Sequence, residues 1–258
     1  MEQTETEAGV YRHTWQVHSY EVDFRKRTTV EAICRRFLDA AWIHAEQLGF
    51  GYEQLARQGL LWVLVRLVVR MESCPLWGHK AELSTWPRGT SGAFALRDFE
   101  IVDSNARPLA AGASSWLVLD AATHRPQRID KLLFGVPNLA GRMRSGPEAR
   151  KLPNLQPGPT AFTTTARYSD IDVNQHVNSA RYIGWLMDCY SPEFHRTHTL
   201  RLVEVNYVSE TKWGDTLSIV SHQPKAAVFS HWIVKPDQSE ACRAELQWEP
   251  DSPEAAQP

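Results

Sequence analysis

The 258-residue sequence contains few cysteines, and their spacing fits no common binding pattern. Cys34, Cys74, Cys189 and Cys242 lie far apart and include no C-x-x-C pair. This spacing favours neither a zinc site nor a disulfide framework, and it fits a reducing compartment. Gly-x-Ser-x-Gly is also missing, which argues against a serine hydrolase with a nucleophile elbow. We therefore expect no metal and no cofactor.

Long apolar runs and a strong charge of either sign are missing too. The chain has no run of about 18 apolar residues, the length that spans a membrane. Residues 1–7 are acidic and have neither the positive nor the apolar region of a signal peptide. The formal net charge is -2, and no long basic run indicates nucleic acid. We expect a cytoplasmic protein without a transit peptide that binds neither membrane nor nucleic acid.

The sequence does have enough apolar residues, 43%, to build a sizeable core in one large or two small domains. A strand, an amphipathic helix and a long strand are predicted at residues 13–23, 29–48 and 60–71, and the same order returns at 162–168, 177–190 and 200–208. Further strands are predicted at residues 80–85, 93–102, 111–119, 216–222, 226–234 and 242–248. This repeat predicts an α+β fold with one helix-and-sheet layer pair in each half.

The two predicted domains cover residues 9–127 and 161–249. Prolines and glycines are frequent in residues 128–160, which we interpret as the linker. Residues 250–258 are predicted to form a disordered tail.

A cluster of polar residues precedes the second predicted helix. Asp172, Asn174 and His176 alternate with apolar neighbours, so an extended or loosely turning backbone would direct them to one side. The backbone N–H groups at a helix start favour a developing oxyanion, and the Asn174 amide can add a donor. An N-cap is the competing interpretation of Asn174. We place the candidate active site here.

Two stretches of sequence resemble the acyl-ACP thioesterase family. The first is Asp-Ile-Asp-Val-Asn-Gln-His-Val-Asn at residues 170–178, followed by Tyr182 and Trp185. The second is the strand and loop at residues 203–215, in which Glu210 matches the acid of that family. Plant members often have a cysteine after this acid, where this chain has Thr211. The resemblance therefore favours an activated water over a thiol nucleophile.

The resemblance implies a tandem, or double, hotdog fold, with the acyl chain bound in the first hotdog and catalysis in the second. The implied substrate partner is an acyl carrier protein bearing an acyl-phosphopantetheine group. Glu210 and His176 would activate water, Asn174 would stabilise the oxyanion, and Asp172 would orient its neighbours. The residues expected to bind substrate are Trp42, Trp62, Leu64, Asn178 and Tyr182.

A comparison of the two halves strengthens this interpretation. When Trp77-Gly78 is aligned with Trp213-Gly214, Asp172, Asn174 and His176 fall opposite Arg36, Leu38 and Ala40, and Glu210 falls opposite Cys74. The polar set is then absent from the first half, which favours a chemical role over a structural one.

Other possibilities stay open. The same site would serve an acyl-CoA thioesterase, and a non-catalytic acyl-binding hotdog protein is the alternative outside enzymes. Two basic clusters could meet an acidic protein: residues 25–27, and Arg142, Arg144, Arg150 and Lys151. The chain is expected to be a monomer or a homodimer.

Overall fold

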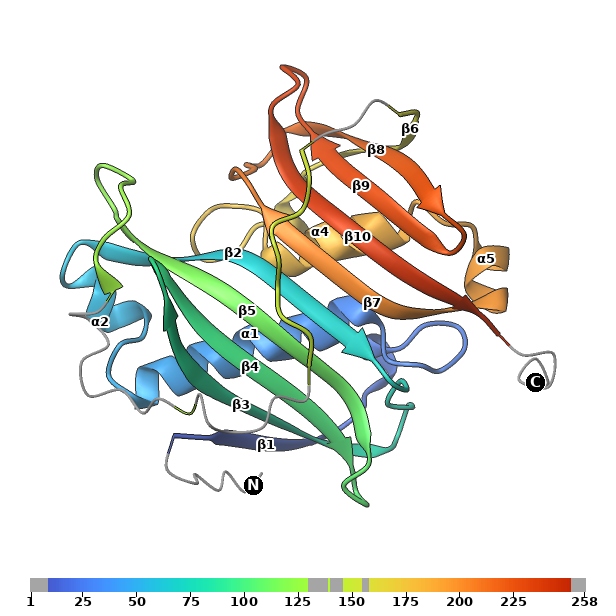
Figure 1. Ribbon diagram of the computed structural model, residues 1–258, viewed down its shortest axis with the longest axis horizontal. Helices are drawn as coiled ribbons and strands as arrows, with labels where there is room; N and C mark the ends of the chain where they lie inside the picture. Colours follow the sequence, from blue (N-terminus) through green and yellow to red (C-terminus); the bar gives the residue numbers. More distant parts are fainter. Residues whose placement is uncertain (1–8, 130–138, 140–145, 155–157, 252–258) are drawn as a thin grey trace. The chain divides into compact units, whose positions relative to one another are not determined.

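The structure is a computed structural model, and it describes residues 9–129, 139, 146–154 and 158–251 (Figure 1). The chain divides into two compact units, residues 1–149 and 150–258. The basic residues Arg142 and Arg144 and most of the predicted tail lie outside the described residues. Within the described part, no helix is long and apolar enough to cross a membrane.

The first unit is an antiparallel sheet with a long helix on one face (Figure 1). Its strand order is β1-β3-β4-β5-β2. The elements are β1 (Tyr11–Gln16), α1 (Val30–Gln47), α2 (Tyr52–Ala56), β2 (Leu60–Met71), β3 (Lys80–Ser91), β4 (Phe94–Asp103) and β5 (Pro108–Asp120).

Helix α1 forms because a cap and an apolar stripe coincide. The Thr29 side chain accepts a hydrogen bond from the Ala32 N–H, which satisfies one open amide at the helix start. Ile33 and Phe37, four residues apart, are fully buried. Phe37 stacks on Phe99 of β4 with 4.5 Å between the ring centroids. Burial of one such side chain stabilises the fold by about 1.5–3 kcal/mol, so this stripe anchors the helix to the sheet.

The second unit repeats this plan with a shorter helix (Figure 1). Its strand order is β7-β10-β9-β8-β6. Ile183 and Leu186 of α4 are fully buried, and they form the apolar face of the helix. The elements are β6 (Thr160–Thr165), α4 (Ser179–Met187), α5 (Pro192–Thr197), β7 (His198–Tyr207), β8 (Thr216–Lys225), β9 (Val228–Val234) and β10 (Glu240–Pro250).

The predicted α+β fold is confirmed, and the differences lie at element ends. The helix predicted at 177–190 is shorter, because Asn178 caps its start and Ser191 caps a separate helix, α5, which was not predicted. Helix α2 was missed as well. Strand β3 continues beyond its predicted end because a bulge between Pro87 and Gly89 accommodates the proline, which has no N–H to donate.

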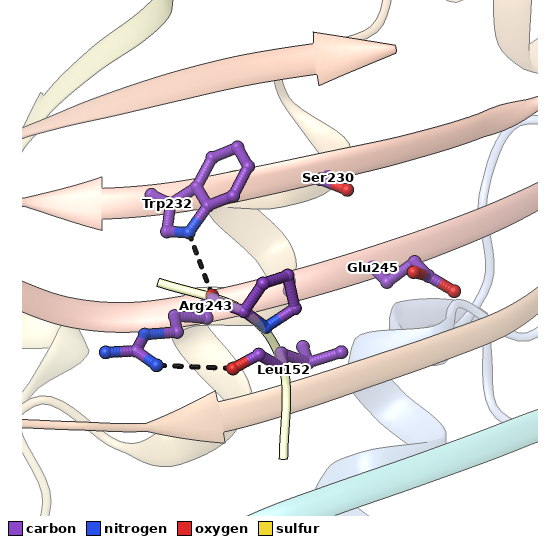
Figure 2. Close-up of a pocket in the computed structure, with 7 residues that line it drawn as sticks. Leu152, Ser230, Trp232, Arg243 and Glu245 are labelled. Carbon is purple, nitrogen blue, oxygen red and sulfur yellow. Dashed lines mark hydrogen bonds between the residues drawn. The ribbon is translucent and has the colours of Figure 1, made fainter. Parts of the chain in front are cut away.

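Residues 150–153 lie against the sheet of the second unit (Figure 2). The Trp232 indole N–H donates to the Pro153 carbonyl at 3.4 Å, and Arg243 donates to the Leu152 carbonyl at 3.2 Å. The cavity between them measures about 10 Å³, which is room for about one water molecule. This cavity is therefore too small to be a substrate site.

Candidate functional site

The polar cluster at residues 172–176 forms a tight turn. The Asp172 N–H donates to the His176 carbonyl at 2.9 Å, and the Gln175 N–H donates to the Asp172 carbonyl at 3.0 Å. Gln175 has a φ of 62°, in the left-handed region. An isolated antiparallel bridge between Ile171 and Val177 closes the turn. The backbone is therefore neither extended nor loose, and the side chains do not simply alternate between two sides.

A backbone hydrogen bond joins this turn to the loop that follows β7. The Val177 N–H donates to the Thr211 carbonyl at 2.8 Å. The same loop is held from the other side, because the Gly214 N–H donates to the Ala166 carbonyl at 2.9 Å. Gly214 has a φ of 85°, a conformation that favours glycine. These contacts place His176, which precedes Val177, next to Glu210, which precedes Thr211.

The side chains of His176 and Glu210 are in direct contact. His176 Nε2 lies 3.1 Å from Glu210 Oε2. The exposed fractions of the two side chains are 28% and 43%, so water reaches both. A histidine beside a carboxylate can exchange a proton with a bound water molecule near neutral pH. The structure thus brings together two of the four predicted catalytic residues.

Asp172 contacts the turn itself. Its Oδ1 accepts a hydrogen bond from the backbone N–H of Asn174 at 2.8 Å. This contact holds the turn and leaves the Asn174 side chain exposed at the tip. The geometry differs from the expected one, in which Asp172 would orient the Asn174 amide or the His176 ring. A carboxylate that accepts a turn amide two residues ahead is a common local contact. The catalytic role of Asp172 stays a prediction.

The cap of α4 is Asn178, and Asn174 does not take that role. Asn178 Oδ1 accepts from the Ala180 N–H at 3.0 Å. The Asn178 N–H donates to the Asp170 carbonyl at 2.8 Å, and the Asn178 carbonyl accepts from the backbone N–H of Arg181 at 2.9 Å. Asn178 therefore caps the helix, and its role in binding substrate stays a prediction. Its side chain also uses one of the helix-start amides that we had expected to face an oxyanion.

The buried Asp170 forms an ion pair with the partly exposed Arg181, a contact that the sequence did not reveal. Asp170 is 4% exposed, and its Oδ1 lies 2.8 Å from Arg181 Nε. Its Oδ2 accepts from the Arg167 N–H at 2.7 Å. The spacing of eleven residues between the partners crosses the turn and the helix start, so no helical periodicity signals the pair.

The other predicted substrate-binding residues occupy different surroundings. Trp42 on α1 is 53% exposed. Leu64 on β2 is buried, and Trp62 on the same strand donates its indole N–H to the Phe50 carbonyl at 2.8 Å. Tyr182 on α4 is buried, with its ring 5.7 Å from that of Tyr207. Their role in binding an acyl chain stays a prediction.

The first unit contains the same turn, which corrects the comparison of halves. The Asp23 N–H donates to the Arg27 carbonyl at 2.9 Å, and the Lys26 N–H donates to the Asp23 carbonyl at 2.9 Å. Asp23 Oδ1 accepts from the Arg25 N–H at 2.8 Å, as Asp172 does from Asn174. The counterparts of Asp172, Asn174 and His176 are therefore Asp23, Arg25 and Arg27, and the alignment with Arg36, Leu38 and Ala40 was wrong.

The alignment failed because the two units differ in length after the turn. The contact from Val177 to Thr211 has its counterpart in the Thr28 N–H, which donates to the Pro75 carbonyl at 2.9 Å. This contact spans 47 residues in the first unit (28 to 75) and 34 in the second (177 to 211), a difference of 13. Glu210 still corresponds to Cys74, since both precede the residue with the accepting carbonyl.

Metal binding has no support among the described residues, which contain no group of three or more His, Cys, Asp or Glu side chains arranged around one ion. Cys34, Cys189 and Cys242 are free thiols, and Thr211 is fully buried. His176 and Glu210 are titratable side chains that this site brings into contact.

Both halves of the chain resemble known proteins. The acyl-ACP thioesterase N-terminal domain model matches residues 8–134, and the C-terminal domain model of the same family matches residues 159–250. A crystal structure of an acyl-ACP thioesterase from Bacteroides thetaiotaomicron is 27% identical, with a TM-score of 0.82 over 93% of this chain and 98% of that one. The 12:0-ACP thioesterase from Umbellularia californica is 25% identical, with a TM-score of 0.85 over 96% and 100%.

Plant sequences are similar over most of this chain. Oleoyl-acyl carrier protein thioesterase 1, chloroplastic, from Arabidopsis thaliana is 29% identical over 231 residues, which cover 82% of this chain and 64% of the relative. The chain thus spans less than two thirds of the length of this relative. The solved structures confirm the predicted hotdog architecture. The two domain models together cover most of the sequence, and the chain belongs to the acyl-ACP thioesterase family.

Proposed function

We propose that this protein hydrolyses acyl-[acyl carrier protein] thioesters to a free fatty acid and the carrier thiol, which ends chain elongation. The observation that carries the proposal is the contact of 3.1 Å between His176 Nε2 and Glu210 Oε2 within the domain matched by the family's C-terminal model. The relatives named above as thioesterases act on acyl-ACP, and this chain takes the same substrate class in our proposal.

Water is the nucleophile in the proposed reaction. His176 donates its Nε2–H to Glu210 Oε2, and Glu210 Oε1 accepts a proton from the water as the water oxygen attacks the thioester carbon. The carbon–sulfur bond then breaks, and the proton passes from the pair to the departing thiolate. The exposed amide of Asn174 donates to the oxyanion, a contribution of about 10²-fold or more where the donor is well placed.

Release of free thiol from matched acyl-ACP and acyl-CoA substrates tests the proposal. We expect turnover of acyl-ACP that falls sharply when the carrier protein is replaced by CoA, because a protein carrier adds contacts outside the site. Equal rates on both carriers would contradict the choice of ACP and favour an acyl-CoA thioesterase. Bound fatty acid without turnover of any thioester would contradict hydrolysis and favour the acyl-binding alternative. The cytoplasmic location and the choice between monomer and homodimer stay predictions.

A further inference from the structure

The core of the first unit contains a buried positive charge. Arg97 of β4 is only 6% exposed. Strand alternation places it on the same face of the sheet as Phe99, two residues away, which stacks on Phe37 of α1. Burial lowers the pKa of Arg97 to about 9, so the guanidinium is still protonated at neutral pH. A buried charge is costly unless an opposite charge or a ligand accompanies it.

The partners of Arg97 are neutral. Its Nη1 lies 3.0 Å from His44 Nδ1 and donates to Thr85 Oγ1 at 3.2 Å. Asp98, the next residue, points to the opposite face, where its Oδ1 lies 3.1 Å from Arg88 Nε. Among the described residues, no carboxylate hydrogen-bonds to Arg97. The charge therefore lacks a counterion from the described part of the chain.

The histidine beside Arg97 has a defined tautomer. Arginine can only donate, so His44 Nδ1 must accept and the ring proton sits on Nε2. Burial, together with the charge of Arg97, lowers the pKa of His44 to about 3, so the ring is neutral. His44 is 1% exposed, and its Nε2 has no hydrogen-bond partner among the described residues. A buried N–H without an acceptor is unfavourable, and it is satisfied when a ligand supplies one.

We infer that His44 and Arg97 form a carboxylate-binding site in the core of the first unit. The Nε2–H of His44 donates to a carboxylate oxygen, and Arg97 holds the ring and supplies the balancing charge. The Nε2–H of His44 and the Arg97 guanidinium are both donors, so the ligand atom must accept. An anion fits better than a neutral oxygen because the guanidinium is uncompensated.

The proposed function supplies two sources for this carboxylate, and the inference rests on that function for their identity. An ordinary acyl thioester contains no carboxylate before hydrolysis. One source is therefore the free fatty acid, bound after release or as an effector. The other is a substrate whose acyl chain ends in a second carboxylate at the end away from the sulfur.

Two variants and one matched control test the site. Arg97→Met and His44→Phe each remove one donor, and Arg88→Met removes an arginine whose partner Asp98 lies on the opposite face. Calorimetric titration compares dodecanoate with dodecanol, and thiol release compares dodecanoyl-ACP with the mono-thioester of dodecanedioic acid on ACP. Thermal unfolding checks that each variant is folded, and His44→Phe preserves a ring of similar size in case Arg97→Met does not fold.

We expect the wild-type protein to prefer the ligand or substrate with the free carboxylate by about tenfold or more. Arg97→Met and His44→Phe should lose this preference, and Arg88→Met should retain it. A preference for dodecanoate alone identifies the free acid, and a preference in kcat/KM for the dicarboxylic chain identifies the substrate. No preference, or one that survives in both variants, would overturn the site. If neither thioester is hydrolysed while the preference for dodecanoate persists, the proposed function fails and the carboxylate site stands.

Discussion

The turn at residues 23–27 and the turn at residues 172–176 share their backbone-to-backbone hydrogen bonds and differ in most of their side chains. In both, an aspartate accepts from a turn amide, and a lysine or a glutamine takes a left-handed φ, 59° in Lys26 and 62° in Gln175. In both, the next N–H reaches the carbonyl of a distant loop. What the two turns share therefore serves the fold.

What differs between the turns marks the candidate chemistry. Arg25 and Arg27 stand where the second unit has Asn174 and His176, and Cys74 stands where it has Glu210. A histidine and a glutamate can exchange a proton with water near neutral pH, whereas an arginine cannot. The two turns share the aspartate contact and differ in Asn174, His176 and Glu210, and the catalytic role of Asp172 stays a prediction.

The largest effect is expected at the position of Glu210. Glu210→Gln preserves shape and removes the proton acceptor, so kcat/KM for acyl-ACP hydrolysis should fall by about 10² to 10⁴-fold. Cys74→Ala at the equivalent position should change the rate by less than about twofold. Cys74 lies in the first unit, whereas His176 and Glu210 lie in the second. Thiol release measures both rates. A Glu210→Gln protein with the wild-type rate would exclude Glu210 as the base.

Replacing His176 by the residue of the other turn is expected to have the next largest effect. His176→Arg maintains a donor beside Glu210 but cannot release its proton, so the rate should fall by about 10²-fold. Arg27→His is the matched control and should leave the rate unchanged. Urea unfolding should show little change in either variant, since both side chains lie on a turn. An active His176→Arg protein would show that the ring only positions Glu210.

The shared aspartates should affect stability more than chemistry. Asp23→Ala and Asp172→Ala should each lower the free energy of unfolding by about 1 kcal/mol, because each leaves a turn amide without its acceptor. The Asp23 variant should lose more, since Asp23 Oδ1 also accepts from the Arg27 N–H at 3.1 Å. Urea unfolding measures both. A loss of activity in Asp172→Ala as large as that in Glu210→Gln would restore Asp172 to the catalytic set.

Glu21, the counterpart of Asp170, should make the first unit sensitive to acid. Burial alone would raise its pKa, but hydrogen bonds from Arg36 and from the His18 N–H outweigh burial and lower the pKa below its ordinary value of 4.5. The stabilisation is therefore present above about pH 4.5 and is lost as the pH falls through the folded value. Glu21→Gln should flatten the decline of stability in this acidic range, as thermal unfolding against pH would show. An unchanged acid profile would refute the assignment.

The smallest effect is expected at the left-handed residues. Lys26→Gly and Gln175→Gly remove the strain of a positive φ but add freedom to the unfolded chain, so each should change the free energy of unfolding by at most about 1 kcal/mol. The two changes should agree in sign, because the turns share one backbone. Opposite signs in the melting temperatures would show that the turns are held differently.

Periodicity predicted most of the fold, and its failures have physical causes. The bounds of β2 follow from a mostly apolar stretch, residues 60–71, which only Arg66 and Arg70 interrupt. The contact between His176 and Glu210 depends on a backbone hydrogen bond from Val177 to Thr211, which no side-chain pattern reports, so only the family resemblance indicated it. The burial of Arg97 was not predicted, because a charged residue within a strand normally faces water.

The segment between the two ends of that backbone hydrogen bond is 13 residues longer in the first unit (28 to 75) than in the second (177 to 211). The hydrogen bond closes at both lengths, so the two helices and the strand between its ends can change in length without losing it. A protein engineer could therefore graft this segment from a relative in which its length differs. The side chains at positions 176 and 210 would still lie side by side, because the backbone hydrogen bond from Val177 to Thr211 places them there.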